Sequence, residues 1–218
     1  MPIEPADRER MTRPRYVGLP TFMRAPYLED WEGLEIGMIG VPYDGGVTNR
    51  PGARHGPREV RNQSTMMRTI NQATGVAPYE LCDVADIGDS FVERPFALNE
   101  SHEEILGVFQ RVHAAGVVPI AVGGDHSISL PILRALASER PVGMVHIDAH
   151  CDTGDDHLGS RFHHGAPFSR AVEEGLLDPK RTVQIGIRGG INSRDQWAFS
   201  YESGMRVIQM HEVYEMGI

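Results

Sequence analysis

Residues 142–152 decide the fold, and they read Val142-Gly143-Met144-Val145-His146-Ile147-Asp148-Ala149-His150-Cys151-Asp152. The first half is an apolar run, which is typical of a parallel strand whose two faces are both covered. The second half places carboxylate and imidazole groups at alternate positions, on Asp148, His150 and Asp152. Because alternate side chains of an extended chain point the same way, we expect these three groups to face one point at the end of the strand. Cys151 has the opposite parity, so we expect it to face away and pack in the interior.

A second group of polar residues follows another strand-like run. Residues 117–122 lead into Gly123-Gly124-Asp125-His126-Ser127. In open parallel sheets, ligands bind beyond the carboxyl ends of the strands, and both groups fall there. Asp125 is predicted to cap the helix that Ser127 opens, since an aspartate at a strand end is more often an N-cap than a metal ligand. We therefore predict a metal site formed by these side chains: His126, Asp148, His150 and Asp152.

The predicted donor set favours a hard divalent cation. Carboxylates with few imidazoles suit Mn²⁺ or a similar cation, whereas thiolates are typical of zinc sites. A carboxylate such as Asp148 can bridge two ions, which lower the pKa of a shared water and orient it as a hydroxide nucleophile. His146 lies two residues before Asp148, so a supporting role behind the ligands stays open. Single histidines such as His102, His113 and His157 are usually surface residues or hydrogen-bonded core residues.

Strand-like and helix-like patterns alternate from residue 34 onward. We expect strands at 34–41, 81–87, 117–122, 142–147, 182–188 and 205–210, and helices at 56–68, 101–114, 127–138, 167–174, 194–203 and from 211. Ser101 with Glu104 three residues later has the spacing of a capping box. Strands separated by crossover helices predict an α/β fold with a mostly parallel sheet. We expect residues 1–30 to form an irregular arm and residues 31–218 to form one α/β metallohydrolase domain.

Composition excludes several classes of protein. A net charge of −9 and a pI near 5.5 argue against nucleic acid or a membrane surface as partner. No apolar run is long enough to cross a bilayer, and the N-terminus shows no secretory signal. The two cysteines, Cys82 and Cys151, form no metal or disulfide pattern, so we expect a cytoplasmic protein. No glycine-rich nucleotide fingerprint or Walker lysine predicts an organic cofactor.

The two metal motifs, in this order, resemble the signatures of the ureohydrolase family, which contains arginase, agmatinase and guanidinobutyrase. Three further stretches extend the resemblance, at residues 49–58, 163–168 and 176–188, and the last two are similar to agmatinase-type members. The resemblance implies a three-layer αβα fold, a centre of two Mn²⁺ ions, and hydrolysis of a guanidinium group to urea and an amine. It also implies a homo-oligomer, trimeric or hexameric, in polyamine metabolism.

The resemblance also assigns roles residue by residue. His126, Asp148, His150 and Asp152 match the metal ligands of the family. His164 matches its proton-shuttling histidine, with the adjacent His163 ranked second. Residues 153–162 match a loop that contacts the substrate tail in family members. In that loop Asp155 or Asp156 would suit the ammonium of agmatine, whereas Arg161 would suit the carboxylate of 4-guanidinobutanoate.

One departure from the family pattern affects activity. Family members continue beyond the position of Ile218 with a strand that carries a Ser-Phe-Asp-x-Asp-type motif with two more aspartate ligands, and a later glutamate holds the guanidinium. We therefore expect a chain truncated at its C-terminus, with weak metal binding and little turnover. The leading hypothesis is an amidinohydrolase acting on a linear guanidino substrate such as agmatine or 4-guanidinobutanoate. The alternatives are a catalytically impaired fragment or paralogue that acts as a non-catalytic oligomer partner, and a related metal-dependent deacylase.

Overall fold

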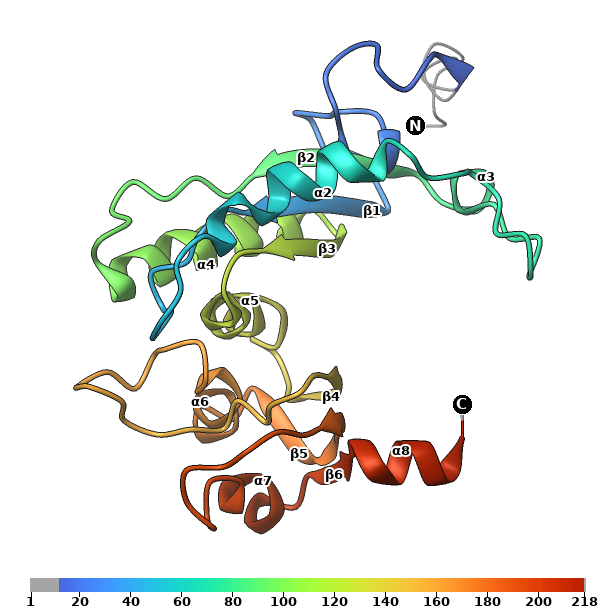
Figure 1. The fold of residues 1–218 in the computed structure, drawn as a ribbon. Coiled ribbons are helices and arrows are strands. Elements are labelled where there is room, and N and C mark those ends of the chain that lie inside the picture. The colour runs from blue at the N-terminus through green and yellow to red at the C-terminus, as the bar shows by residue number, and fades with distance from the viewer. Residues whose placement is uncertain (1–11, 218) are drawn as a thin grey trace.

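The computed structural model describes residues 12–217, and within them all named strands belong to two parallel sheets (Figure 1). One sheet has the order β2-β1-β3 and the other the order β4-β5-β6. The strands are β1 (Ile36–Val41), β2 (Val84–Asp89), β3 (Val118–Gly123), β4 (Val142–Ile147), β5 (Leu177–Ile187) and β6 (Arg206–Gln209). The longer helices are α2 (Gly56–Ser64), α4 (Leu98–Ala114), α5 (Ser129–Leu136), α6 (Pro167–Glu173), α7 (Ala198–Ser203) and α8 (Met210–Met216).

The central strand β1 shows why the first sheet is covered on both faces. Ile39 and Val41 belong to an apolar cluster with Ile105 and Phe109 of α4. Met38, which has the opposite parity, belongs to a different cluster that contains Phe22 and Ala25. Alternate side chains of one strand thus enter two separate cores, as the three-layer αβα fold requires.

The second sheet has a smaller core of its own. Leu130 of α5, Phe168 of α6, Leu177 of β5 and Met205 are all buried in one cluster. Helix α5 packs against both α4 and α6, and Figure 1 shows it between the two sheets. The connection from β3 through α5 to β4 therefore holds the two halves of the molecule together.

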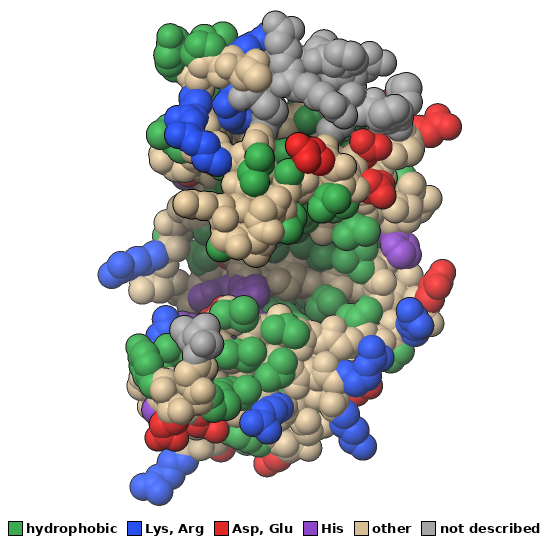
Figure 2. All heavy atoms as spheres, turned by 90° about the vertical axis from the view of Figure 1, so that its right-hand side faces the viewer, with side chains coloured by type: hydrophobic (Ala, Val, Ile, Leu, Met, Phe, Trp, Pro, Cys, Tyr) green, Lys and Arg blue, Asp and Glu red, His purple; other side chains and the backbone are tan. Residues whose placement is uncertain are grey.

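Strands β3 and β4 each pair on one side only within the described residues. β3 pairs with β1, and β4 pairs with β5. Their apolar side chains are accordingly exposed: 61% for Val118, 47% for Ile120, 70% for Val145 and 79% for Ile147. Figure 2 shows a groove between the two halves, with hydrophobic and histidine side chains along it. The apolar runs of these two strands predict that both of their faces are covered, and within the described residues this prediction is wrong.

Helix α4 has its N-cap four residues earlier than the capping pattern predicts. Its N-cap is Ala97, and no side chain caps it. Ser101 lies inside the helix, and its hydroxyl donates to the carbonyl oxygen of Arg94 at 2.9 Å. The Glu104 carboxylate accepts from the N–H of Glu93 at 2.7 Å. The predicted Ser101 cap is wrong because both side chains hold the preceding loop instead.

Other predicted elements differ only at their ends. The helix predicted to reach residue 68 ends at Ser64, and the strand predicted from residue 81 starts at Val84, after the short helix α3 (Pro78–Leu81). β5 begins five residues before the predicted start, because an irregularity in its pairing with β4 interrupts the alternating pattern. At this irregularity the Thr182 hydroxyl donates to the carbonyl oxygen of Asp178 at 2.8 Å.

The segment before β1 packs against the first sheet over part of its length. Phe22 and Ala25 are buried, and Tyr27 forms a bridge with Asp86 of β2. Residues 1–11 of the expected arm lie outside the described residues. Among residues 12–217, no helix has both the length and the apolar character needed to cross a membrane.

Candidate metal centre

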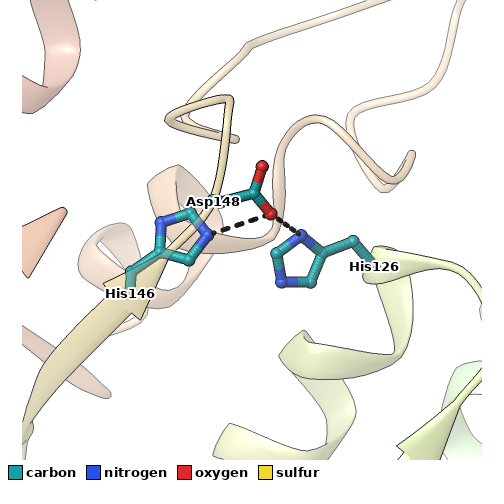
Figure 3. A group of neighbouring side chains, drawn as sticks. All are labelled: His126, His146 and Asp148. Atoms are coloured by element: carbon teal, nitrogen blue, oxygen red, sulfur yellow. Dashed lines mark ion pairs between the residues drawn. The ribbon is translucent and has the colours of Figure 1, made fainter. Parts of the chain in front are cut away.

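Three donor groups converge where the two halves of the molecule meet. His126 is the first residue of a short helix after β3, while His146 lies in β4 and Asp148 just beyond it. Their ligand atoms all lie within 4.8 Å of one another (Figure 3). Asp148 Oδ2 is 3.7 Å from His126 Nδ1 and 3.5 Å from His146 Nε2. The predicted pairing of the two strand ends is therefore present in the structure.

Asp125 fixes the start of the helix that presents His126. One of its carboxylate oxygens accepts from the N–H of Ser127 at 2.7 Å, and the other accepts from the N–H of Gly46 at 2.8 Å. The predicted N-cap is thus confirmed. Because the second bond reaches the loop after β1, the same carboxylate also ties that loop to the site.

The chain does not stay extended after β4, so the expected geometry of residues 148–152 is wrong. The Asp148 side chain turns the backbone by accepting from the N–H of His150 at 2.8 Å. Asp152 has a φ of 49°, in the left-handed region. This turn still brings Asp152 to the cluster, with its Oδ2 2.5 Å from His126 Nδ1. Cys151 is buried as predicted, and burial raises the pKa of its thiol to about 11.

His150 lies at the rim of this group. Its side chain is 70% exposed, and its Nδ1 is 3.7 Å from Asp148 Oδ1. The structure thus brings Asp148 and Asp152 each close to His126, so that three of the four predicted ligands lie together, and it leaves the fourth beside them. Carboxylates and imidazoles in this arrangement fit a divalent cation such as Mn²⁺.

The cluster shifts the pKa values of its own members. Burial alone would lower the pKa of His126, but the hydrogen bond and charge of Asp152 outweigh it and raise the pKa. Burial lowers the pKa of His146, and the positive charge of His126 lowers it further. Burial would raise the pKa of Asp148, yet the N–H of His150 and the two imidazoles lower it overall. These contacts favour the charged form of the Asp148 carboxylate, which is the form that binds a metal.

Two residues near the cluster, His146 and Phe168, are not assigned to it by the sequence pattern. His146 takes part directly, and Phe168 packs against both imidazoles, with ring centroids 4.6 Å from His146 and 5.2 Å from His126. A histidine inside an apolar strand is itself a signal, because a buried polar group needs a hydrogen-bonding partner. Phe168 carries no such signal, because an apolar residue in a helix is normally interpreted as part of the hydrophobic core.

The two candidate proton-transfer histidines lie on the loop after Asp152. His164 Nε2 is 3.0 Å from the hydroxyl oxygen of Thr48, and the N–H of His164 donates to the carbonyl oxygen of Gly46 at 2.9 Å. His163 Nε2 is instead 2.9 Å from the carbonyl oxygen of Asp155, within its own loop. His164 is thus attached through Gly46 to the loop that Asp125 anchors.

The same loop contains an ion-pair network. Arg161 Nε lies 2.9 Å and Arg170 Nη1 3.1 Å from Asp155 Oδ1. Both arginines also pair with Glu173. The hydrogen bond from Arg161 lowers the pKa of Asp155. Asp155 and Arg161, the residues predicted to choose between an ammonium and a carboxylate tail, therefore bind each other in the structure.

Comparison with known proteins identifies relatives along nearly the whole chain. The family model described as the arginase family matches residues 34–218. The chain is 56% identical over 206 residues to guanidinopropionase from Pseudomonas aeruginosa, covering 94% of this chain and 64% of that protein. It is 44% identical over 211 residues to mitochondrial agmatinase from Gallus gallus, covering 96% and 61%. The chain thus spans less than two thirds of the length of these relatives.

Solved structures of other proteins also match this chain over most of its length. Proclavaminate amidino hydrolase from Streptomyces clavuligerus matches with a TM-score of 0.88 and 37% identity, over 94% of this chain and 68% of that one. A structure of formiminoglutamase with Mn²⁺ from Trypanosoma cruzi matches with a TM-score of 0.78 and 27% identity, over 91% and 67%. Each match covers both sheets of this chain, so the two halves are arranged as in longer proteins.

Proposed function

Because this chain belongs to the arginase family, we propose that it forms the metal-binding part of an enzyme that hydrolyses a linear guanidino compound to urea and an amine. The observation that carries this proposal is the convergence of His126, His146 and Asp148, whose donor atoms lie within 4.8 Å of one another. Mn²⁺ bound there would lower the pKa of a coordinated water and make it a nucleophile at neutral pH. In the proposal His126, Asp148, His150 and Asp152 hold the metal.

The protein's own groups supply orientation and proton transfer. The Asp125 carboxylate holds the helix start that presents His126, and the His126–Asp152 contact keeps both groups in place before a metal arrives. We assign His164 the proton transfer to the leaving amine. Its contact with Thr48 fixes the position of one imidazole nitrogen, at 3.0 Å. A histidine is suited to this role because its unperturbed pKa lies near neutral pH.

For the substrate, the proposal is a guanidino acid such as 3-guanidinopropionate or 4-guanidinobutanoate, with agmatine as the competing candidate. Identity is higher to the guanidinopropionase, at 56%, than to the agmatinase, at 44%. Asp155, one of the two carboxylates considered for the ammonium of agmatine, is paired with Arg161 and Arg170. Arg161, which was considered for a carboxylate tail, is paired in turn with Asp155 and Glu173, so this loop favours neither tail and the substrate proposal rests on the identities.

Urea release tests the proposal in two proteins. One is the 218-residue chain; the other is a chimera in which the remaining third of the Pseudomonas aeruginosa guanidinopropionase follows residue 218. With Mn²⁺, we expect little urea from the chain alone and turnover by the chimera, faster on guanidino acids than on agmatine. Asp148→Asn should abolish Mn²⁺ binding and turnover, whereas Asp30→Asn, at an exposed position before β1, should preserve both. A chimera with Asp148→Asn that keeps full turnover would refute the metal assignment, and faster turnover of agmatine would refute the substrate class.

The exposed edges of β3 and β4 favour a second candidate function for the chain alone, namely binding to another protein chain as a non-catalytic oligomer partner. Unpaired strand edges with apolar side chains are ready to pair with a further strand. Turnover by the chimera separates the two functions, since only the first requires that residues 126–152 support catalysis once the chain is completed. A cytoplasmic location, a trimeric or hexameric assembly, two Mn²⁺ ions, and one domain over residues 31–218 stay predictions.

A further inference from the structure

A buried glutamine contacts the histidine next to the candidate metal centre. Gln184 of β5 lies directly beside His146 of β4 in the register of the second sheet, and its side chain is fully buried. Its amide nitrogen is 2.6 Å from the carbonyl oxygen of Cys151 and 3.1 Å from His146 Nδ1. One side chain thus contacts both the β4 histidine and the backbone of the turn that carries Asp148 and Asp152.

The orientation of this amide follows from the first contact. A backbone carbonyl oxygen can only accept a hydrogen bond, so the NH₂ group of Gln184 must face Cys151. The flipped amide would place two oxygens against each other at 2.6 Å. The NH₂ group has a second hydrogen, and the atom within reach of it is His146 Nδ1. Gln184 therefore donates to His146.

The protonation of the imidazole follows from the second contact. Since Nδ1 accepts a hydrogen bond, it carries no proton, and the proton of the neutral ring is on Nε2. A doubly protonated ring would set two donors against each other at Nδ1. His146 Nε2 is buried and has no hydrogen-bond partner among residues 12–217, where the nearest carboxylate oxygen, Asp148 Oδ2, is 3.5 Å away. The N–H of His146 thus faces the Asp148 carboxylate.

We propose that Gln184 is a positioning residue, which fixes His146 as the Nε2–H tautomer so that His146 orients Asp148 and does not itself bind the metal. A nitrogen that carries a proton has no lone pair for a cation. The cluster of His126, His146 and Asp148 is then two ligands and one supporting donor, and further ligands come from the turn at residues 150–152. Donors behind the ligands commonly tune metal affinity by 10- to 100-fold. The effect on affinity, but not the tautomer, rests on the proposed function.

The tautomer is measured first, in the metal-free chain labelled with ¹⁵N-histidine at pH 8. We expect long-range ¹H–¹⁵N correlations to show His146 protonated at Nε2 and bare at Nδ1, with its signals identified by their loss in His146→Gln. Gln184→Leu should give a mixture of tautomers, and Gln184→Glu should protonate Nδ1. Gln196→Leu, which removes an exposed glutamine, should change nothing. A wild-type signal with the proton on Nδ1 would overturn the proposal, whether or not the chain binds metal.

Mn²⁺ affinity, followed by electron paramagnetic resonance of the free ion, gives the second readout in the chimera. We expect Gln184→Leu to weaken binding about 10- to 100-fold. His146→Gln, which keeps an N–H donor, should weaken binding less than 10-fold, while His126→Gln should weaken it more than 100-fold. Equal losses in His146→Gln and His126→Gln would make His146 a ligand and overturn the inference. If no variant binds Mn²⁺, the proposed function fails while the tautomer measurement still decides this inference.

Discussion

We expect an added methyl group to change the free energy of unfolding in opposite directions at two glycine positions. Gly56 opens α2, where an added Cβ would lie 2.5 Å from the carbonyl oxygen of Gly123. Gly107 lies inside α4, where an added Cβ meets nothing within 4 Å. We expect Gly56→Ala to lower the free energy of unfolding by about 1–3 kcal/mol through overpacking. Gly107→Ala should raise it by about 0.5–1 kcal/mol through helix propensity. Urea denaturation followed by circular dichroism measures both, and changes of the same sign would contradict this account.

Replacement of His164 separates proton transfer from metal binding. In the active chimera, we expect His164→Ala to lower urea release by about 100-fold or more, because general acid catalysis contributes that much. Mn²⁺ content should stay within about twofold, since His164 is attached to the loop at Gly46 rather than to the metal cluster. Metal analysis beside the urea assay makes the comparison, with the exposed His113→Ala as control. Loss of Mn²⁺ in His164→Ala would place the residue among the ligands instead.

At the residue scale, the alternation of polar side chains correctly predicted that Asp148 and Asp152 lie near His126. The extended geometry on which that prediction was based is wrong. Asp148 and Asp152 do meet His126, yet they do so through a turn and not through an extended strand. The turn depends on the Asp148 side chain accepting from the N–H of His150, and parity cannot show such a bond. Gln184 could not be found either, because its contact with His146 depends on the register between two strands.

Helix α4 contains a buried histidine that links stability to pH. His102 is 2% exposed, and its Nε2 lies 3.2 Å from the hydroxyl oxygen of Ser127. Burial, helped by the charge of Arg134, lowers the pKa of His102 from 6.5 to about 4. Between these values the unfolded chain binds a proton that the folded chain does not. Stability is therefore fully present above about pH 6.5 and falls as the pH drops toward 4, by about 3 kcal/mol for a shift of this size.

The measurement is the free energy of unfolding at pH 7 and pH 5 for three proteins. We expect wild type to lose more stability on acidification than His102→Gln, whose amide can still bond to Ser127 but does not titrate. His113→Gln, an exposed position on the same helix, should behave as wild type does. Equal losses in wild type and His102→Gln would show that other groups carry the acid sensitivity.

At the element scale, apolar runs and helical periodicity located the elements, and tertiary contacts set their ends. The strand predicted at residues 142–147 matches β4 at both ends. Helix α4 starts early because Leu98 packs against the core and adds a turn before Ser101. The start of β5 was hidden because the irregular pairing near Asp178 breaks the alternation on which the prediction relied.

At the scale of the whole molecule, the sequence indicates a parallel sheet with both faces covered, but it does not give the order of the strands. β3 and β4 are as apolar as central strands, yet each is an edge within residues 12–217. The relatives extend beyond the matched region, and the chain covers only 64% of the guanidinopropionase. The apolar character of these edges is what a central strand needs, so a local pattern could not distinguish the two situations.

Self-association of the 218-residue chain is the consequence we expect from these edges. An exposed, apolar strand edge templates pairing with another chain, and a lysine on the edge blocks it. The double variant Val118→Lys/Val145→Lys places one charge on each edge, whereas Leu158→Lys places one on an exposed loop residue. In sedimentation velocity at increasing concentration, we expect wild type and Leu158→Lys to associate and the double variant to stay monomeric. If the double variant associates as wild type does, the chains meet through another surface, and the unpaired edges of β3 and β4 are not what drives assembly.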